Sequence, residues 1–163
     1  MNYDVFAMYI VDKLLSVVDE ERREVLLPLK EIDRSIIGPR SFIEINEGNV
    51  FVFLNSIDDR RCPFSIEFDI SDGYLWLAFY TIGTEISITY PASEEDKRFI
   101  KEHIEHFMKS SIVLRRKCFM FLCFYEKEEN DERYLLFGFN EYTDYIRRIL
   151  KEKGEIHFLP WIS

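Results

Sequence analysis

The sequence predicts an α+β fold in which an antiparallel meander of about five strands, followed by a later hairpin, is packed by N-terminal, middle and C-terminal helices. Two observations indicate this fold. Apolar residues follow a helical period at both ends of the chain but a period of two between residues 41 and 90. Strand and helix patterns also do not alternate regularly, as they do in parallel α/β proteins. Because the chain has 163 residues, 47% of them apolar, we expect a single domain over 1–163.

The N-terminal part of the chain predicts two helices. The first is expected over residues 3–18, because its apolar residues recur on one side of a 3.6-residue repeat. The acidic residues 19–21 break this stripe and are expected to end the helix. A second, short helix is predicted to begin near Pro28, since proline suits a first helical position, and to end at Gly38-Pro39.

Residues 41–90 show the period of two that is typical of strands. The segment 64–71 alternates apolar and polar side chains without interruption, and 85–90 repeats this pattern. The segments 50–54 and 74–80 are apolar on both faces, which favours central strands. Turn residues separate these segments, so the pattern predicts hairpin connections. The predicted turns are Glu47-Gly48-Asn49, Asp72-Gly73 and Gly83-Thr84.

The middle helix and the later hairpin follow the meander. Ser93 with Asp96 three residues later matches a capping box, with aspartate in place of the usual glutamate. The helix that begins there is expected to end near Ser110. Two strands, 117–125 and 134–139, are predicted to form the later hairpin.

The last predicted element is a helix from about Glu141 to Lys153. Asn140 is its expected N-terminal cap, and Gly154 suits its C-terminal end. This helix would complete the set that packs on the sheet.

The cysteines and the apolar segments indicate the compartment. Three cysteines at irregular spacing, Cys62, Cys118 and Cys123, do not form the framework of a secreted disulfide-rich protein. The first residues lack the cationic region of a signal peptide. The apolar segment 118–125 has eight residues, too few for a membrane-spanning helix. We therefore expect a cytoplasmic protein without membrane contact.

No motif for catalysis or cofactor binding is present in the sequence. Six glycines, none at the required spacing, do not form a phosphate-binding loop, and no Gly-x-Ser-x-Gly nucleophile elbow exists. His103 and His106 lie three residues apart on the predicted middle helix and would offer two ligands to a metal ion, but no third ligand accompanies them. We therefore expect no catalytic residue, no cofactor and no metal, and a protein that is not an enzyme.

The negative charge is concentrated in the predicted meander. The chain has 21 Lys and Arg against 30 Asp and Glu, a net charge of -9, and residues 41–90 supply eight of the acids and two of the bases. Such a chain repels phosphate backbones, so we expect no direct nucleic-acid binding, and it attracts a basic protein. The candidate partner-binding residues are Glu44, Asp58, Asp59, Glu67, Asp69, Asp72, Glu85, Glu128, Glu129 and Asp131.

Two acidic segments, Glu67-Phe68-Asp69 and residues 126–132, illustrate a resemblance. The chain resembles the small cytoplasmic immunity proteins of bacterial toxin–immunity systems, especially those of contact-dependent growth inhibition. The resemblance spans the whole chain and consists of one acidic, aromatic-rich α+β domain without a catalytic motif. It implies that the protein binds a cognate toxin domain, often a basic nuclease, tightly and blocks its active site or substrate groove. We expect the protein to be a monomer.

Two alternatives remain open at the level of sequence. The order of elements is also similar to that of type III secretion-like chaperones, which bind an effector segment as homodimers and have three strands before the middle helix. A small enzyme that uses the carboxylates of Glu67 and Asp69 or the two histidines is the third class. The immunity hypothesis requires that the negative charge gather on one exposed region and not be paired with neighbouring arginines or lysines.

Overall fold

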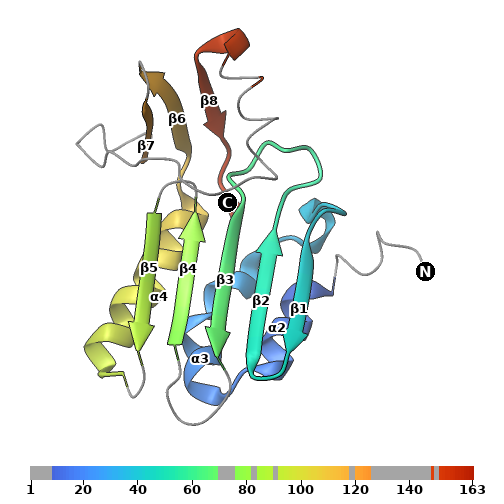
Figure 1. Cartoon of the computed structure of the whole chain (residues 1–163), viewed down its shortest axis with the longest axis vertical. Coiled ribbons are helices and arrows are strands. Elements are labelled where there is room, and N and C mark those ends of the chain that lie inside the picture. Colours follow the sequence, from blue (N-terminus) through green and yellow to red (C-terminus); the bar gives the residue numbers. More distant parts are fainter. Residues whose placement is uncertain are drawn as a thin grey trace.

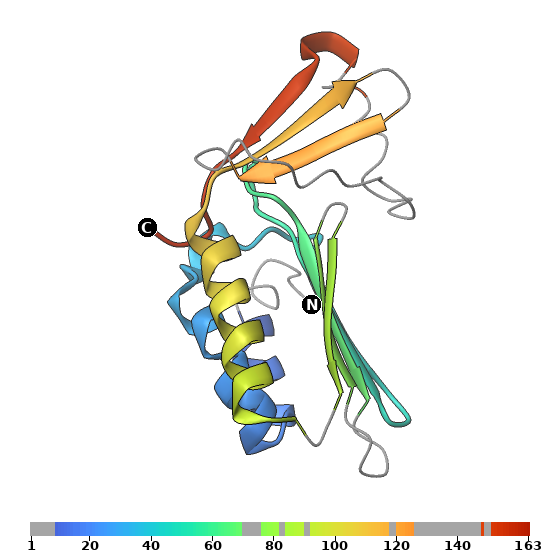
Figure 2. The same ribbon diagram turned by 90° about the vertical axis from the view of Figure 1, so that its left-hand side faces the viewer.

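Two antiparallel sheets and one layer of helices build the described part of the chain in a computed structural model. The described residues are 9–69, 76–81, 84–89, 92–117, 120–125, 148 and 151–163. Figure 1 looks onto the larger sheet, and Figure 2 shows that the helices lie on one side of it. The smaller sheet lies beyond one end of the larger sheet. The predicted α+β class is confirmed.

The larger sheet is the predicted meander. Its five strands are antiparallel to their neighbours and follow the order β1-β2-β3-β4-β5. They are β1 (Phe42–Asn46), β2 (Asn49–Leu54), β3 (Phe64–Asp69), β4 (Trp76–Thr81) and β5 (Thr84–Thr89). The turn between β1 and β2 requires glycine, because Gly48 has a φ of 90°, in the left-handed region.

One face of this sheet carries the core. Because side chains alternate across a strand, every second residue of β2 and β3 points toward the helices. These side chains are fully buried: Val50, Val52, Leu54, Phe64, Ile66 and Phe68. The intervening residues form the opposite face.

The helical layer contains α2 (Ile10–Val17), α3 (Glu20–Val25), the 3-10 helices η1 (Leu27–Glu31) and η2 (Arg34–Ile36), and α4 (Glu94–Lys109). The capping box at the start of α4 is confirmed. The Asp96 N–H donates to the Ser93 hydroxyl at 3.1 Å, and the Ser93 N–H donates to the Asp96 carboxylate at 3.3 Å. Residues 3–8 of the first predicted helix lie outside the described residues.

Helix α2 ends at Val17, before the acidic run at 19–21, as predicted, but α3 was not predicted. The Asp19 carboxylate accepts a hydrogen bond from the Arg22 N–H at 2.9 Å and so caps α3. The single helix expected from Pro28 is divided into η1 and η2. The extended backbone at Ile32 ends η1, and Asp33 caps η2 through the Ser35 N–H.

A buried arginine connects α3 to the sheet. Arg22 is 1% exposed, forms an ion pair with Asp19 and donates to the Asp69 carbonyl at 2.8 Å. Its guanidinium carbon lies 5.4 Å from the centre of the Phe68 ring. The cation is thus compensated by one carboxylate, one carbonyl and one aromatic ring, as a buried charge requires.

The smaller sheet has the order β7-β6-β8, with β6 (Ile112–Lys117), β7 (Met120–Tyr125) and β8 (Glu155–Phe158). Here the predicted hairpin needs correction, because residues 112–125 form both β6 and β7 where one strand over 117–125 was expected. The second predicted strand, 134–139, lies outside the described residues.

The sequence did not predict β8. It pairs with β6. The Glu155 carboxylate accepts a hydrogen bond from Arg115 Nε at 2.8 Å and forms a second hydrogen bond, of 2.9 Å, with His157 Nε2. Two hydrogen bonds lower the pKa of Glu155: the one with His157 has the larger effect, and the one with Arg115 follows. Of the predicted C-terminal helix, residues 148 and 151–153 are helical, and the rest lies outside the described residues. Gly154 has a φ of 79°, which fits its predicted role as the helix end.

Trp161 anchors residues 159–163, which we call the C-terminal segment, in the core. Its indole N–H donates to the Cys62 carbonyl at 2.8 Å, and its ring packs edge-on against Phe64 at 5.4 Å between centres. The backbone N–H groups of Trp161 and Ile162 both donate to the Met108 carbonyl, at 2.8 and 3.0 Å. These bonds satisfy a carbonyl at the end of α4 and fix the segment beside it.

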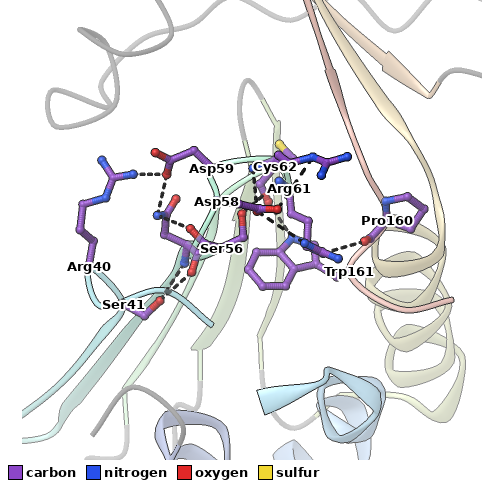
Figure 3. Close-up of polar contacts among 11 residues, drawn as sticks. Arg40, Ser41, Ser56, Asp58, Asp59, Arg61, Cys62, Pro160 and Trp161 are labelled. Carbon is purple, nitrogen blue, oxygen red and sulfur yellow. Dashed lines mark hydrogen bonds and ion pairs between the residues drawn. The ribbon is translucent and has the colours of Figure 1, made fainter. Parts of the chain in front are cut away.

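A second set of bonds ties the same segment to the loop between β2 and β3 (Figure 3). The Leu159 N–H donates to the Arg60 carbonyl at 2.8 Å, and Arg61 Nε donates to the Pro160 carbonyl at 3.1 Å. The C-terminal segment therefore connects the smaller sheet, α4 and the larger sheet.

We predict that Trp161→Ala lowers the free energy of unfolding by about 3–5 kcal/mol, because it removes a large buried ring and its hydrogen bond. Trp161→Phe should cost about 1–3 kcal/mol, since it keeps a ring but leaves the buried Cys62 carbonyl without its donor. Urea unfolding monitored by circular dichroism gives both values. Leu159→Ala, a change at a half-exposed residue of the same segment, is the control and should cost less than about 1 kcal/mol. Equal losses for Trp161→Ala and Leu159→Ala would contradict the anchor role.

Candidate functional site

The face of the larger sheet that points away from the helices carries the candidate site. We call it the open face and define it by the outward residues of β1, β2 and β3. They are Phe42, Glu44, Asn46, Asn49, Phe51, Phe53, Ser65, Glu67 and Asp69. The register makes Phe51 the direct neighbour of Glu44 on one side and of Glu67 on the other. Such neighbours have Cβ atoms about 5 Å apart, so the three side chains form one continuous row across three strands.

Aromatic side chains form the apolar part of the open face. The Phe42 ring lies 5.7 Å from the Phe51 ring and 5.7 Å from the Phe53 ring, both in tilted arrangements. Phe42 and Phe51 are half-buried, whereas Phe53, nearer the smaller sheet, is 3% exposed. The accessible part of the face is therefore the part that holds Glu44, Phe51 and Glu67.

The carboxylates of this row have no counter-ion among the residues that the structure describes. Among the described residues, no ion pair or hydrogen bond engages the side chain of Glu44, which is exposed, or of Glu67, which is half-buried. The described side chains of β1, β2 and β3 include no lysine, arginine or histidine. Two strand spacings, about 10 Å, separate the two glutamates, so the row offers two well-separated anionic groups with an aromatic ring between them.

Asp69 lies at the end of the same face. Its backbone carbonyl accepts the hydrogen bond from Arg22, so this residue also contributes to the attachment of α3. A substitution at Asp69 would therefore test binding less cleanly than one at Glu44 or Glu67.

The structure places Asp58 and Asp59 elsewhere, in the loop between β2 and β3 (Figure 3). Asp58 lies 3.8 Å from Arg60 and 3.6 Å from Arg61. Asp59, whose φ of 55° is left-handed, forms an ion pair with Arg40 and accepts a hydrogen bond from Asn55 at 2.9 Å. These arginines compensate both carboxylates, so their observed role is to shape the loop, and their partner-binding role stays a prediction.

The remaining predicted residues are less informative. Glu85 lies in β5, opposite Tyr80 in the register with β4. Asp72, Glu128, Glu129 and Asp131 lie outside the described residues. The structure thus brings together Glu44, Glu67 and Asp69 on one face and separates Asp58 and Asp59 from them.

The sequence analysis missed the aromatic half of the site. Phe42 and Phe51 were not among the candidate residues, because apolar residues in a predicted strand are expected in the core. The signal that identifies them is the register of the first hairpin. A turn at Glu47 and Gly48 that pairs Asn46 with Asn49 necessarily places Phe51 on the same face as Glu44.

Other candidate chemistry receives little support. His103 is half-buried and His106 is exposed on α4, and among the described residues no group of three histidine, cysteine or acidic side chains is placed to hold a metal ion. The part of the chain that the structure describes therefore contains no cluster of the kind that a structural or catalytic zinc site requires.

A cavity of about 380 Å³ lies between the 3-10 helices and the C-terminal segment. It is lined by Glu31, Asp33, Ile36, Arg61 and residues 159–163. Hydrogen bonds from the backbone N–H and the hydroxyl of Ser35 lower the pKa of Asp33, and the charges of Arg61 and Arg34 act in the same direction. Asp33 is therefore a weak base at neutral pH, and Arg61 already bonds Pro160, so these two groups are poorly suited to acid–base catalysis.

The loop that holds Asp58 and Asp59 requires glycine at position 38, because the two backbone segments approach each other closely there. The Gly38 N–H donates to the Asn55 carbonyl at 2.7 Å, and an added Cβ would lie 2.8 Å from the Ser56 carbonyl atoms. Because backbone cannot rotate away as a side chain does, Gly38→Ala should lower the free energy of unfolding by about 3 kcal/mol.

Gly154→Ala is the matched comparison in chemical denaturation. Among the described residues, no atom beyond Gly154 and its two chain neighbours would lie within 4 Å of the added Cβ. The left-handed backbone at φ 79° is then the main opposition, at a cost of about 1 kcal/mol. If Gly154→Ala proved as costly as Gly38→Ala, the close approach of Gly38 to the loop would not limit stability.

Within the described ranges, every helix is either too short or too polar to cross a bilayer. No family model, curated protein or solved structure matches this chain.

Proposed function

We propose that this protein binds a basic protein partner through the open face and neutralises it, in the manner of a toxin–immunity protein. The observation that carries this proposal is the row Glu44–Phe51–Glu67, in which two carboxylates flank a half-buried aromatic ring and have no counter-ion in the described part of the chain. The partner is a toxin domain with a basic active site or substrate groove.

The electrostatic part of the mechanism acts at long range. Uncompensated carboxylates on one face attract the cationic groove of the partner and speed the encounter between the two proteins. In the complex, the two glutamates take positions that phosphates of a nuclease substrate would occupy, and lysines and arginines of the partner bind them. The groove is then both neutralised and covered.

The aromatic part of the mechanism acts at contact. Phe51 and Phe42 retain accessible surface on the open face, and burial of that surface contributes about 25 cal/mol per Å². Aromatic anchors surrounded by polar groups are the arrangement found at the energetically dominant positions of protein interfaces. The row therefore combines attraction with an apolar contact.

The chaperone alternative requires a homodimer, which the immunity hypothesis does not. Five strands precede α4 among the described residues, where the chaperone architecture has three. Sedimentation of the purified protein separates the two ideas, because a monomer at micromolar concentration agrees with the immunity hypothesis and an obligate dimer with the chaperone.

We predict that the combined change Glu44→Lys and Glu67→Lys slows association with the partner by at least ~10-fold and changes dissociation less. The assay is stopped-flow mixing with the product of the adjacent upstream gene, the candidate toxin, at several salt concentrations. The wild-type rate should fall steeply as salt rises, since screening shortens the range of the attraction.

The control is Glu24→Lys with Glu95→Lys, which makes the same change in net charge at exposed sites on the helical layer. It should slow association far less than the change on the open face. An association rate that does not change with salt concentration would rule out recognition by the open face. Equal slowing of association by the two pairs of substitutions would rule it out as well.

A further inference from the structure

The outer edge of β1 is the second feature of the molecule that is suited to binding. β1 is the first strand of the larger sheet, and within the described ranges no strand pairs with its other side. An unpaired edge presents backbone N–H and C=O groups that can bond an additional strand.

The hairpin register identifies the outward backbone groups. The turn closes on the pair Asn46 and Asn49, so this pair is hydrogen-bonded, and hydrogen-bonded pairs alternate from there along an antiparallel ladder. Glu44 therefore bonds β2. Ile43 and Ile45 belong to the non-bonded pairs, and their N–H and C=O groups point away from the sheet.

Three features that commonly protect an edge strand are absent from the described β1. Its sequence, Phe-Ile-Glu-Ile-Asn, contains no proline and no lysine, and its five consecutive pairs with β2 contain no bulge. Ile45 is 44% exposed beside these open backbone groups. The only charge on the strand is that of Glu44, which belongs to the open face.

We infer that the edge of β1 accepts an extended segment of the basic partner as an added strand. This inference rests on the proposed function and specifies how the partner is held. The segment would bond the outward groups of Ile43 and Ile45, place basic side chains near Glu44, and place apolar side chains beside the two isoleucines. An alternation of basic and apolar residues is thus the sequence pattern that this edge would recognise.

A second copy of this chain fits the edge poorly. In the antiparallel arrangement that pairs Ile43 of one copy with Ile45 of the other, Glu44 lies directly opposite Glu44. Like charges directly opposite each other destabilise a strand pair, and each copy carries a net charge of -9. Charge therefore favours a basic segment over self-association.

The test uses a capped heptapeptide that alternates valine and lysine, with a peptide of the same composition but with the lysines in one block as control. We expect the alternating peptide to bind the full chain at least ~10-fold more tightly, because only it presents one charged and one apolar side in an extended strand. Hydrogen exchange monitored by NMR should show slower exchange of the Ile43 and Ile45 amides on binding. Equal binding of both peptides, or unchanged exchange of these amides, would overturn the inference.

Ile45→Pro removes an N–H that β2 does not use, and proline is tolerated on edge strands. This variant should lose at least ~10-fold in affinity for the alternating peptide, whereas Ile45→Thr, which keeps the N–H, should retain binding. If Ile45→Pro does not fold, the exchange measurement on the wild-type chain decides the matter.

The same variants separate this inference from the proposed function. If the candidate toxin binds Ile45→Pro as well as wild type but not the Glu44→Lys and Glu67→Lys variant, the open face binds the partner and the edge does not. If the toxin does not bind the wild-type chain, the proposed function fails. A wild-type dimer that Ile45→Pro converts to a monomer would identify a second copy as the occupant and overturn the inference.

Discussion

Burial of Trp161 is the interaction on which the rest of the structure depends. Trp161 lies in the segment that follows β8. Its side chain packs in the same hydrophobic core as residues of α2 and β2. Its ring contacts Phe64, and its N–H groups bond Cys62 and the last turn of α4. Because Cys62 belongs to the loop between β2 and β3, the same anchor positions that loop. The smaller sheet and the open face are thereby held in one arrangement.

The register of the first hairpin determines what the open face can do. A shift of β2 by one residue would bring Val50 and Val52 to the solvent and turn Phe51 toward the helices, away from Glu44 and Glu67. The helices prevent this shift, because they need the apolar side chains of β2 and β3 for the core. The same packing requirement that stabilises the fold therefore places Glu44 and Glu67 in one row. In the proposed function, folding and recognition use opposite faces of the same strands.

The sequence predicted those parts of the fold that depend on local pattern. Strand β3 and the capping box at Ser93 were correct, since alternation and cap spacing are visible within a few residues. Strand β8 was missed because it has four residues and its partner, β6, lies about 40 positions earlier in the chain. The ion pair of Asp59 with Arg40 was likewise invisible, because it joins residues 19 positions apart. Composition located the acids but could not separate those that shape a loop from those that face solvent.

The comparison of the two sheets supports recognition as the reason for the uncompensated row. In the smaller sheet, Arg115 and Glu155 are direct cross-strand neighbours and form an ion pair at 2.8 Å. Such opposite-charge pairs stabilise a sheet by roughly 0.2–1 kcal/mol. On the open face, Glu44 and Glu67 instead flank Phe51, an arrangement that contributes no comparable attraction to folding. A lysine at either position would supply a compensating charge, so the two glutamates are better explained by what they attract from outside the molecule than by what they stabilise within it.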